Sequence, residues 1–317
     1  MYEIKQPNHI LFGFNSAKNY PYPKNCLLIT SPGAKKREWP SYLNLNHVEI
    51  FDQVENNPSL KTTEKIIEKY TNYPISAIVG VGGGSCLDVA KYIGFKLKKP
   101  KILVPTTFGS GSEVTRISVL KVDGKKVSFH NDRLIADMAI IDSYFLLNTP
   151  DKIFKNSVID ACAQCTESFD SKNSNPYTKF LCKLAFEKLE NGILTNDNES
   201  IVLGSLYTGL GFGNASTTLG HALSYVFSNE GISHGHALAY TTTISHKFNN
   251  SIFYDRFLKI VKKLNFEPIK LNQNLHNAAD LILSDKKHLD NNPKTINKDN
   301  IIQLLKKINS INSVNDF

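Results

Sequence analysis

The sequence predicts an α/β N-terminal Rossmann-like domain followed by an all-α C-terminal domain. Short apolar runs alternate with helical patterns in residues 1–150, whereas the segments after residue 150 are helical and contain no convincing strand. Strand and helix in alternation are typical of parallel βαβ units. The run Asn148-Thr149-Pro150 separates the two patterns. We therefore expect one domain at 1–150 and a second, helical domain at 151–317.

The elements follow from hydrophobic periodicity and turn residues. Strands are expected at 26–30, 47–51, 75–82, 101–105 and 138–142, with helices at 59–70 and 85–98. Asp123-Gly124 between two alternating segments predicts a β-hairpin over 116–130. Later helices are expected at 160–169, 176–191, 200–213, 216–227, 236–248 and about 298–308. Charged and amide residues dominate 284–300, which is expected to be a solvated loop.

Composition excludes several classes of protein. The net charge of +8 is spread over scattered lysines, and the densest basic run, Lys35-Lys36-Arg37, is three residues long. That distribution favours anionic small molecules over nucleic acid. Five cysteines show no disulfide spacing, and the N-terminus has no apolar secretory core, so we expect a reduced, cytoplasmic protein. No apolar run is long enough to span a membrane. Cys162 and Cys165 are expected to be small core residues on a helix.

A glycine-rich turn follows the expected strand at 75–82. Gly82, Gly83, Gly84 and Ser85 connect that strand to a helix. Glycine lets the backbone approach a phosphate, and the helix N-terminus offers unpaired N–H groups. Asp88 lies in the first turn of this helix, where a carboxylate is favourable. The alternative is a tight strand-to-helix turn that binds nothing.

A second polar loop, 105–115, follows the next expected strand. It reads PTTFGSGSEVT and is rich in hydroxyl side chains that can wrap a pyrophosphate or a ribose. An ordinary capped turn is the alternative, so the two loops matter chiefly because they occur together. The hydroxyl residues assigned to cofactor binding are Thr106, Thr107, Ser110, Ser112 and Thr115.

Three of the nine histidines lie within sixteen residues, at His221, His234 and His236. Apolar residues at helical spacing surround His221, a turn covers 228–233, and a second apolar segment resumes at 237. His221 and His234 can therefore face each other across a helical corner and bind a divalent metal ion. Buried or turn histidines without metal are the alternative.

Four sequence blocks resemble the iron-containing (group III, metal-dependent) alcohol dehydrogenase family over residues 8 to 250. They are GGGSCLDVAK, PTTFGSGSEVT, ADMAIID followed by DACAQCTESF, and GHALSY with SHGHALA. The resemblance implies a dehydroquinate synthase-like architecture in which 1–150 binds NAD(P)H. It further implies that 151–317 binds substrate and one divalent metal ion, with iron and zinc as the first candidates.

By the same resemblance, the metal ligands match Asp160, Gln164, His221 and His234. Gln164 stands where the family has a histidine, four residues after Asp160 and on the same helical face. It either coordinates the ion, hydrogen-bonds a metal-bound water, or marks a site that has lost its metal. The position often assigned to proton relay holds Tyr225. His236 is the alternative for relay or substrate contact, and a supporting role is the other possibility.

The resemblance also bears on cofactor and substrate. NAD-preferring members carry an acidic residue after this strand, where the chain reads Ser31-Pro32-Gly33, and the nearby basic run favours NADP(H) over NAD(H). Lys126 matches a lysine near the cofactor. Gln164 and GHALSY are most similar to the branch that reduces phosphonoacetaldehyde to 2-hydroxyethylphosphonate. A small, anionic aldehyde or alcohol is therefore the expected substrate. The protein is expected to form a homodimer. Cations close to the motifs are Arg116, Lys126, His130 and Lys155.

Three other functions remain open from the sequence. One is a polyol- or glycerol-type dehydrogenase of the same superfamily, and another is a dehydroquinate synthase-like lyase. The third is a non-catalytic nucleotide-binding homologue, which the glutamine at residue 164 makes conceivable.

Overall fold

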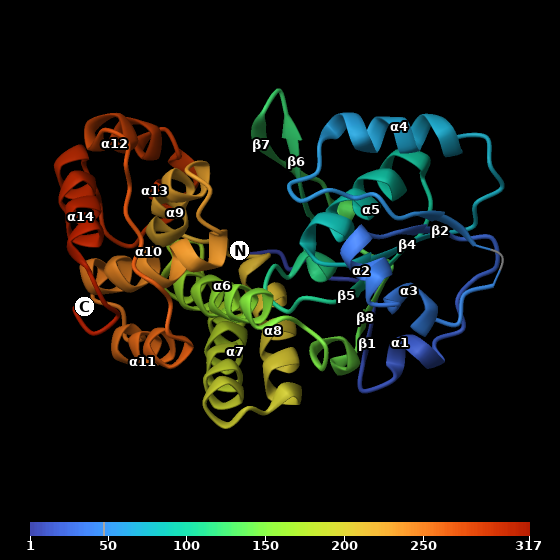
Figure 1. Cartoon of the computed structure of the whole chain (residues 1–317), viewed down its shortest axis with the longest axis horizontal. Coiled ribbons are helices and arrows are strands. Elements are labelled where there is room, and N and C mark those ends of the chain that lie inside the picture. The colour runs from blue at the N-terminus through green and yellow to red at the C-terminus, as the bar shows by residue number, and fades with distance from the viewer. Residues whose placement is uncertain (47) are drawn as a thin grey trace. The chain divides into compact units, whose positions relative to one another are not determined.

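The computed structural model describes residues 1–46 and 48–317 and divides the chain into two compact units. One unit comprises Glu3–Thr149, and the other comprises Pro150–Phe317 (Figure 1). Figure 1 shows strands with covering helices in the first unit and helices alone in the second. The expected fold class is confirmed.

A six-stranded parallel sheet forms the centre of the first unit, in the order β1-β8-β5-β4-β2-β3. β4 and β5 are buried along their whole length, which explains their continuous apolar runs. β1 was not predicted, because its four residues alternate between exposed and half-buried positions. His47, in the expected strand 47–51, lies outside the described residues. The bounds are β1 His9–Phe12, β2 Leu27–Ile29, β3 Glu49–Phe51, β4 Ile78–Gly82, β5 Lys101–Pro105 and β8 Met138–Ile141.

Helices cover this sheet and supply much of its core. α4 begins after Ser59, whose side chain accepts a hydrogen bond from the N–H of Thr62, and it buries Ile66 and Tyr70 against the sheet core. α5 follows β4 directly and contributes Leu87 to the same core. The bounds are α1 Ser16–Asn19, α2 Pro32–Lys36, α3 Trp39–Tyr42, α4 Leu60–Tyr70 and α5 Gly84–Leu97, with 3₁₀ turns at η1 Ser112–Val114, η2 Asp132–Leu134 and η3 Ser143–Leu146.

The predicted hairpin forms a separate two-stranded sheet, β6 (Ile117–Val122) with β7 (Lys125–His130). Asp123 and Gly124 both have positive φ, at 49° and 81°, as a tight two-residue hairpin turn requires. The hairpin appears in green in Figure 1.

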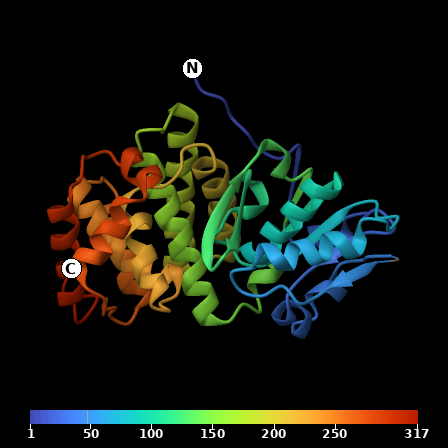
Figure 2. The same cartoon turned by 90° about the horizontal axis from the view of Figure 1, so that it is seen from above.

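The second unit is built from helices, and its described residues form no strand. Figure 2 shows the same helices from above. α6 is twice as long as expected, because it starts directly after Pro150, and it buries Cys162 and Cys165 in the core. The bounds are α6 Asp151–Asp170, α7 Pro176–Thr195, α8 Asn198–Phe212, α9 Leu219–Asn229, α10 His234–Asn249, α11 Tyr254–Leu264, α12 Leu275–Leu283, α13 Lys286–Asn291 and α14 Lys298–Ser310.

The prediction of a solvated loop over 284–300 is wrong. Asp285 caps α13, and His288, Asn291 and Asn292 are buried. The Asn291 side chain donates hydrogen bonds to the backbone carbonyls of Ala215 and Thr217, both at 3.0 Å. The Asn291 side chain can therefore be buried, because backbone carbonyls in another segment accept its hydrogen bonds.

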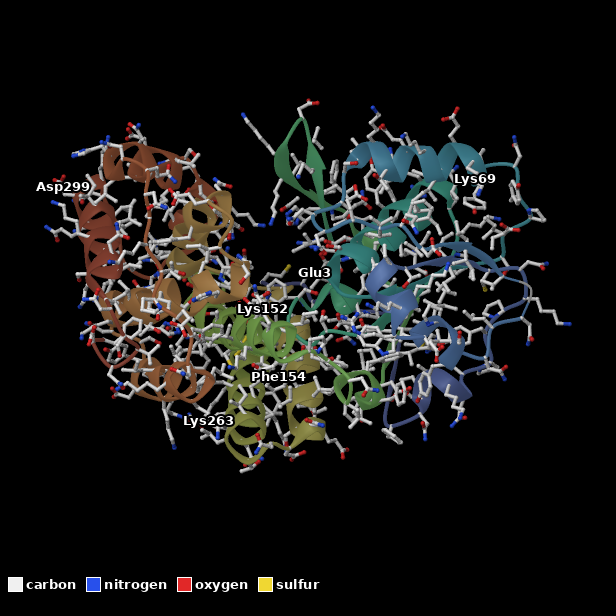
Figure 3. All side chains as sticks on the ribbon, in the orientation of Figure 1. Glu3, Lys69, Lys152, Phe154, Lys263 and Asp299 are labelled. Atoms are coloured by element: carbon white, nitrogen blue, oxygen red, sulfur yellow. The ribbon has the colours of Figure 1, made fainter. Side chains whose placement is uncertain are left out.

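The outer faces of the helices carry the charged residues. Lys69 on α4, Lys263 on α11 and Asp299 on α14 are exposed, as Figure 3 illustrates. No helix formed by the described residues has both the length and the apolar character needed to cross a bilayer.

Candidate cofactor and metal sites

The carboxyl ends of three adjacent strands bring the predicted cofactor residues together. β4 lies between β2 and β5, and the polar segments that begin at Ser31, Gly83 and Thr106 follow these strands. The N–H of Thr106 donates to the Gly82 carbonyl at 3.0 Å. The Ser31 hydroxyl lies within hydrogen-bonding reach of the Cys86 thiol on α5. Ligands of open α/β sheets bind at this edge.

The glycine run is required by close packing. A Cβ on Gly83 would lie 3.0 Å from Thr107 Oγ1, and a Cβ on Gly84 would lie 2.9 Å from Ser110 Oγ. Gly82 has φ +153°, and a Cβ there would lie 2.6 Å from the Cys86 sulfur in the first turn of α5. The two loops predicted from the sequence therefore touch each other, with no space for a larger residue between them.

This edge fits a phosphate group. α5 begins at Gly84, and no side chain caps its first turn, so its leading N–H groups have no partner within the helix. Thr106 Oγ1 is sealed from solvent and has no hydrogen-bond partner among the described residues. Unpaired donors at a helix N-terminus beside an unpaired hydroxyl are what a pyrophosphate would satisfy.

Asp88 and Ser112, both expected to contact the cofactor, form hydrogen bonds within the protein. The Asp88 carboxylate accepts hydrogen bonds from Ser112 Oγ at 2.6 Å and from the N–H of Val119 at 3.0 Å. Lys91, which is fully buried, lies 3.0 Å from the same carboxylate and donates to the Ser112 carbonyl at 2.8 Å. Burial lowers the pKa of Lys91 and Asp88 opposes that shift. These residues hold the second loop in place.

The remaining predicted cofactor residues differ in position. Ser110 Oγ accepts a hydrogen bond from the N–H of Ser112 at 3.3 Å. Thr115 is buried at the end of η1, and beside it burial raises the pKa of the Glu113 carboxyl to about 7. Lys126 is exposed on β7, and its neighbour in the register of the adjacent strand is Lys121 on β6.

An acidic residue neutralises part of the basic run. Lys35 forms an ion pair with Asp52, which directly follows β3, and this contact lowers the pKa of Asp52. Arg37 donates to the Gly33 carbonyl at 2.8 Å and lies 4.8 Å from the ring centre of Trp39. The sequence did not indicate Asp52, because the contact depends on β3 lying beside β2.

Three predicted metal ligands converge in the second unit. Asp160 is on α6, His221 is on α9, and His234 is the first residue of α10. Asp160 Oδ1 lies 3.7 Å from His221 Nε2 and 4.0 Å from His234 Nε2. One ligand atom from each residue lies within 4.8 Å of the others. A carboxylate and two imidazoles at this spacing can bind one divalent ion.

Gln164 also reaches this centre. Its Nε2 donates to Asp160 Oδ1 at 3.0 Å, and its Oε1 is buried with no partner among the described residues. Rotation of the amide by 180° exchanges the two atoms. An unpaired buried amide oxygen beside a carboxylate fits a fourth ligand.

Buried second contacts orient both imidazoles. Glu167 Oε2 lies 2.6 Å from His221 Nδ1 and accepts the N–H of Thr218 at 3.1 Å. Ser224 Oγ lies 3.3 Å from His234 Nδ1. In both histidines the supported nitrogen is Nδ1, and Nε2 is the nitrogen nearer to Asp160, as in many histidine metal sites. Burial lowers the pKa of His221, but Glu167 and Asp160 outweigh burial and raise it to about 9.

The two candidate relay residues are placed differently. The Tyr225 ring lies parallel to that of His234, with 6.0 Å between centroids, and burial raises its pKa. His236 instead hydrogen-bonds the Glu267 carbonyl through Nε2 at 2.5 Å and stacks on Phe266. Tyr225 therefore lies beside the candidate metal ligands, whereas His236 Nε2 hydrogen-bonds the backbone of Glu267.

Sequence reasoning missed two residues at this centre. Glu167 lies on the same face of α6 as Asp160 and Gln164, so its helical spacing was an available signal. His288 has centroid distances of 6.3 Å to His221 and 5.7 Å to Tyr225, and it comes from the segment expected to be a loop.

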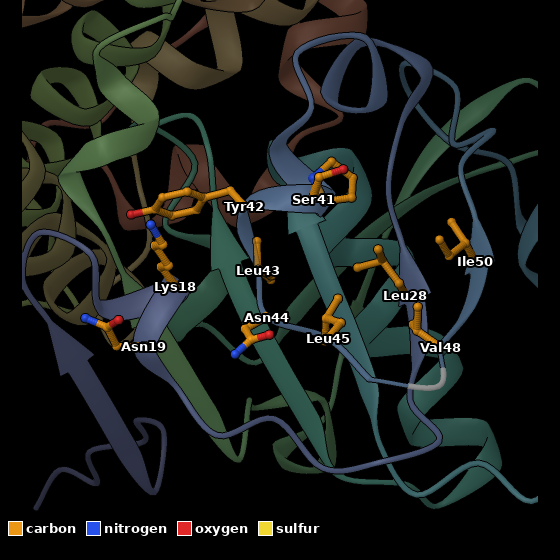
Figure 4. Close-up of a pocket in the computed structure, with 11 residues that line it drawn as sticks. Lys18, Asn19, Leu28, Ser41, Tyr42, Leu43, Asn44, Leu45, Val48 and Ile50 are labelled. Carbon is orange, nitrogen blue, oxygen red and sulfur yellow. The ribbon is translucent and has the colours of Figure 1, made fainter.

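A cavity of about 650 Å³ in the first unit is separate from these residues (Figure 4). Lys18, Tyr42, Leu45 and Ile50 are among its lining residues, and none of the predicted site residues lines it. The chemistry-bearing residues therefore do not coincide with this cavity.

Each unit matches a family model. Residues 7–143 match the model of iron-containing alcohol dehydrogenase, and residues 154–282 match that of the C-terminal part of the Fe-containing alcohol dehydrogenase family. The 4-hydroxybutyrate dehydrogenase of Clostridium kluyveri is 36% identical over 57% of this chain and 56% of its own length. The chain thus spans little more than half of that relative.

Two further similarities extend over nearly the whole chain. The sulfoacetaldehyde reductase of Bilophila wadsworthia is 25% identical over 92% of this chain and 93% of its own length. The structure of a sulfoacetaldehyde reductase from Bifidobacterium kashiwanohense in complex with NAD⁺ has a TM-score of 0.87, with 22% identity over 98% of this chain and 99% of that one. With both units matched, the chain belongs to the iron-containing alcohol dehydrogenase family.

Proposed function

We propose that the protein catalyses reversible hydride transfer between NAD(P)H and a small aldehyde, with its primary alcohol as the other partner. The convergence of Asp160, His221 and His234, with the unpaired amide oxygen of Gln164, carries this proposal. Ligand atoms that converge in this way support an intact centre over the remnant expected in a non-catalytic nucleotide-binding homologue.

The four candidate ligands would hold the metal ion, and a buried carboxylate would orient one of them. Asp160, Gln164, His221 and His234 would hold an ion that, when bound, acts as a Lewis acid toward the carbonyl oxygen. Glu167 orients His221 through Nδ1.

Tyr225 lies against His234, and the raised pKa keeps its phenol protonated. Its hydroxyl is therefore suited to hydrogen-bonding the substrate oxygen, and solvent supplies the proton.

For the cofactor, we propose NADP(H) in preference to NAD(H). Ser31 supports this, because it supplies no carboxylate for a ribose 2′-hydroxyl. Lys36 and Arg37 are nearby cations, while Lys35 is shared with Asp52. For the metal we propose iron or zinc, since both accept imidazole and carboxylate ligands.

For the substrate, we propose a short aldehyde that carries an anionic group, with phosphonoacetaldehyde as one candidate. Two relatives are named for short anionic compounds, 4-hydroxybutyrate and sulfoacetaldehyde. The chain's own net charge of +8 is consistent with anionic substrates.

Oxidation of NADPH and NADH with a panel of aldehydes tests the proposal. The panel contains butanal, succinic semialdehyde, sulfoacetaldehyde and phosphonoacetaldehyde. We expect turnover that is lost on thorough chelation and restored by Fe²⁺ or Zn²⁺. Tight cofactor binding without turnover of any aldehyde, in protein reloaded with metal, would instead support a non-catalytic nucleotide-binding protein.

A further inference from the structure

His288 completes a closed group of four aromatic side chains at the metal centre. Successive centroid distances are 5.5 Å from His221 to His234, 6.0 Å to Tyr225, 5.7 Å to His288 and 6.3 Å back to His221. Two of the four rings are candidate ligands, and Tyr225 is the relay candidate. His288 is the fourth ring, and it has no role in the proposed function.

The His288 ring is anchored at one nitrogen only. Nδ1 lies 2.6 Å from Asp285 Oδ2, and the N–H of His288 donates to the same carboxylate group. Since a carboxylate only accepts, this contact places a proton on Nδ1. Nε2 makes no hydrogen bond within the described part of the chain and is not among its sealed, unpaired polar atoms. Nε2 is therefore the nitrogen of His288 that remains for a ligand.

The geometry does not make His288 a further metal ligand. Its ring is nearly parallel to that of His221, with an interplanar angle of 15°, and stands beside it. The ligand atoms that lie within 4.8 Å of one another come from Asp160, His221 and His234. His288 instead lies beside a candidate ligand, His221, and beside Tyr225, so it can contact a substrate at atoms beyond the carbonyl group.

We infer that His288, held by Asp285, binds through Nε2 a second oxygen-bearing group of the substrate, a few carbon atoms from the reacting carbonyl. This inference rests on the proposed function, and it names the class of substrate as short aldehydes with a second hydroxyl or oxyanion group. Asp285 is a positioning residue, because it fixes the tautomer and the ring orientation of His288. A site that hydrogen-bonds such a group discriminates against analogues that lack it.

Four variants separate substrate contact from structural support. His288→Asn keeps a donor at the Nδ1 position for Asp285 and removes Nε2. His288→Gln keeps a polar atom near the Nε2 position and gives up the Asp285 contact. Asp285→Asn loosens the anchor. Lys286→Ala changes an exposed residue of the same helix and is the matched control.

The readout is kcat/KM at one fixed pH for paired aldehydes. The pairs are propanal with 3-hydroxypropanal and butanal with succinic semialdehyde. Binding of the corresponding alcohols, measured by calorimetry without cofactor, provides a second readout that does not depend on turnover. Wild-type turnover of propanal and butanal tests the proposed function separately.

We expect wild type to prefer at least one substituted aldehyde, and His288→Asn to reduce that preference about 10- to 100-fold through KM. His288→Gln and Asp285→Asn should lose less, and Lys286→Ala should match wild type. Equal losses on both members of each pair would overturn the inference, as would a wild-type enzyme with no preference. If no aldehyde is turned over, the calorimetric comparison of the same variants still decides it.

Discussion

The candidate cofactor site and the candidate metal centre are built in opposite ways. In the first unit, backbone turns at the ends of adjacent strands form the site, and Gly83 and Gly84 contribute by lacking a side chain. In the second unit, side chains from α6, α9 and α10 converge, and a carboxylate supports one of the imidazoles. The first site depends on close backbone approach, and the second depends on specific ligand atoms.

This difference predicts that the two sites fail separately. Removing a ligand atom should abolish metal binding and leave nucleotide binding intact. Adding a single methyl group between the loops should weaken nucleotide binding and leave metal binding intact. Each prediction below tests one side of this contrast.

The largest effect is expected from Asp160→Ala. It removes the carboxylate that faces both His221 and His234, and it leaves Gln164 without its partner. Loss of Lewis-acid stabilisation should lower kcat by at least about 1000-fold. Steady-state kinetics and metal analysis measure the loss, while the affinity for NADPH should stay within twofold. His276→Ala, an exposed histidine on α12, is the control.

A smaller loss is expected from Glu167→Ala. This variant keeps every ligand and removes the buried carboxylate 2.6 Å from His221 Nδ1. Metal affinity should fall about 10- to 100-fold, as measured by competition with a chelating dye. Glu187→Ala on the exposed face of α7 controls for lost charge. Unchanged affinity would mean that Glu167 serves only to pack the core.

Gly84→Ala tests the other unit. A Cβ there would lie 2.9 Å from Ser110 Oγ and 3.1 Å from Ser110 Cβ, so the Ser110 side chain must move away from the helix N-terminus. We expect about a tenfold weaker cofactor affinity in a fluorescence titration, with metal content unchanged. Lys96→Ala, exposed near the other end of α5, should bind normally. Loss of metal in Gly84→Ala would contradict the prediction that the two sites fail separately.

The smallest effect concerns cofactor choice. Asp52→Asn frees Lys35 from an exposed ion pair. The ratio of kcat/KM for NADPH to that for NADH should rise about two- to fivefold, in keeping with the modest energy of surface pairs. Asp290→Asn, an exposed residue of the second unit, is the control. A falling ratio would show that Asp52 does not compete with the 2′-phosphate for Lys35.

The same contrast explains what could be predicted from the sequence. The strand-to-helix glycine turn and the following hydroxyl loop are each continuous in sequence, and they were located correctly. The hydrogen bond between Ser112 and Asp88 could not be predicted, because the two residues are 24 positions apart in the sequence. Strand β1 was not predicted, because its four residues alternate between exposed and half-buried positions and give little hydrophobic periodicity.

The candidate metal centre was harder to predict, because side chains from separate helices form it. The histidine cluster on α9 and α10 was visible, whereas His288 lies in a segment whose polar composition is typical of loops. Asn291 in that segment is buried because it pairs with carbonyls some 75 residues away. No local pattern carries that information.

The most direct test of the account is the metal content of the purified protein by inductively coupled plasma mass spectrometry, with Asp160→Ala prepared in parallel. We predict about one divalent ion per chain in the wild type after growth with iron and zinc, and almost none in the variant. Equal metal content in the two proteins, or a wild type that binds no divalent ion even when iron or zinc is added, would contradict the assignment of this centre.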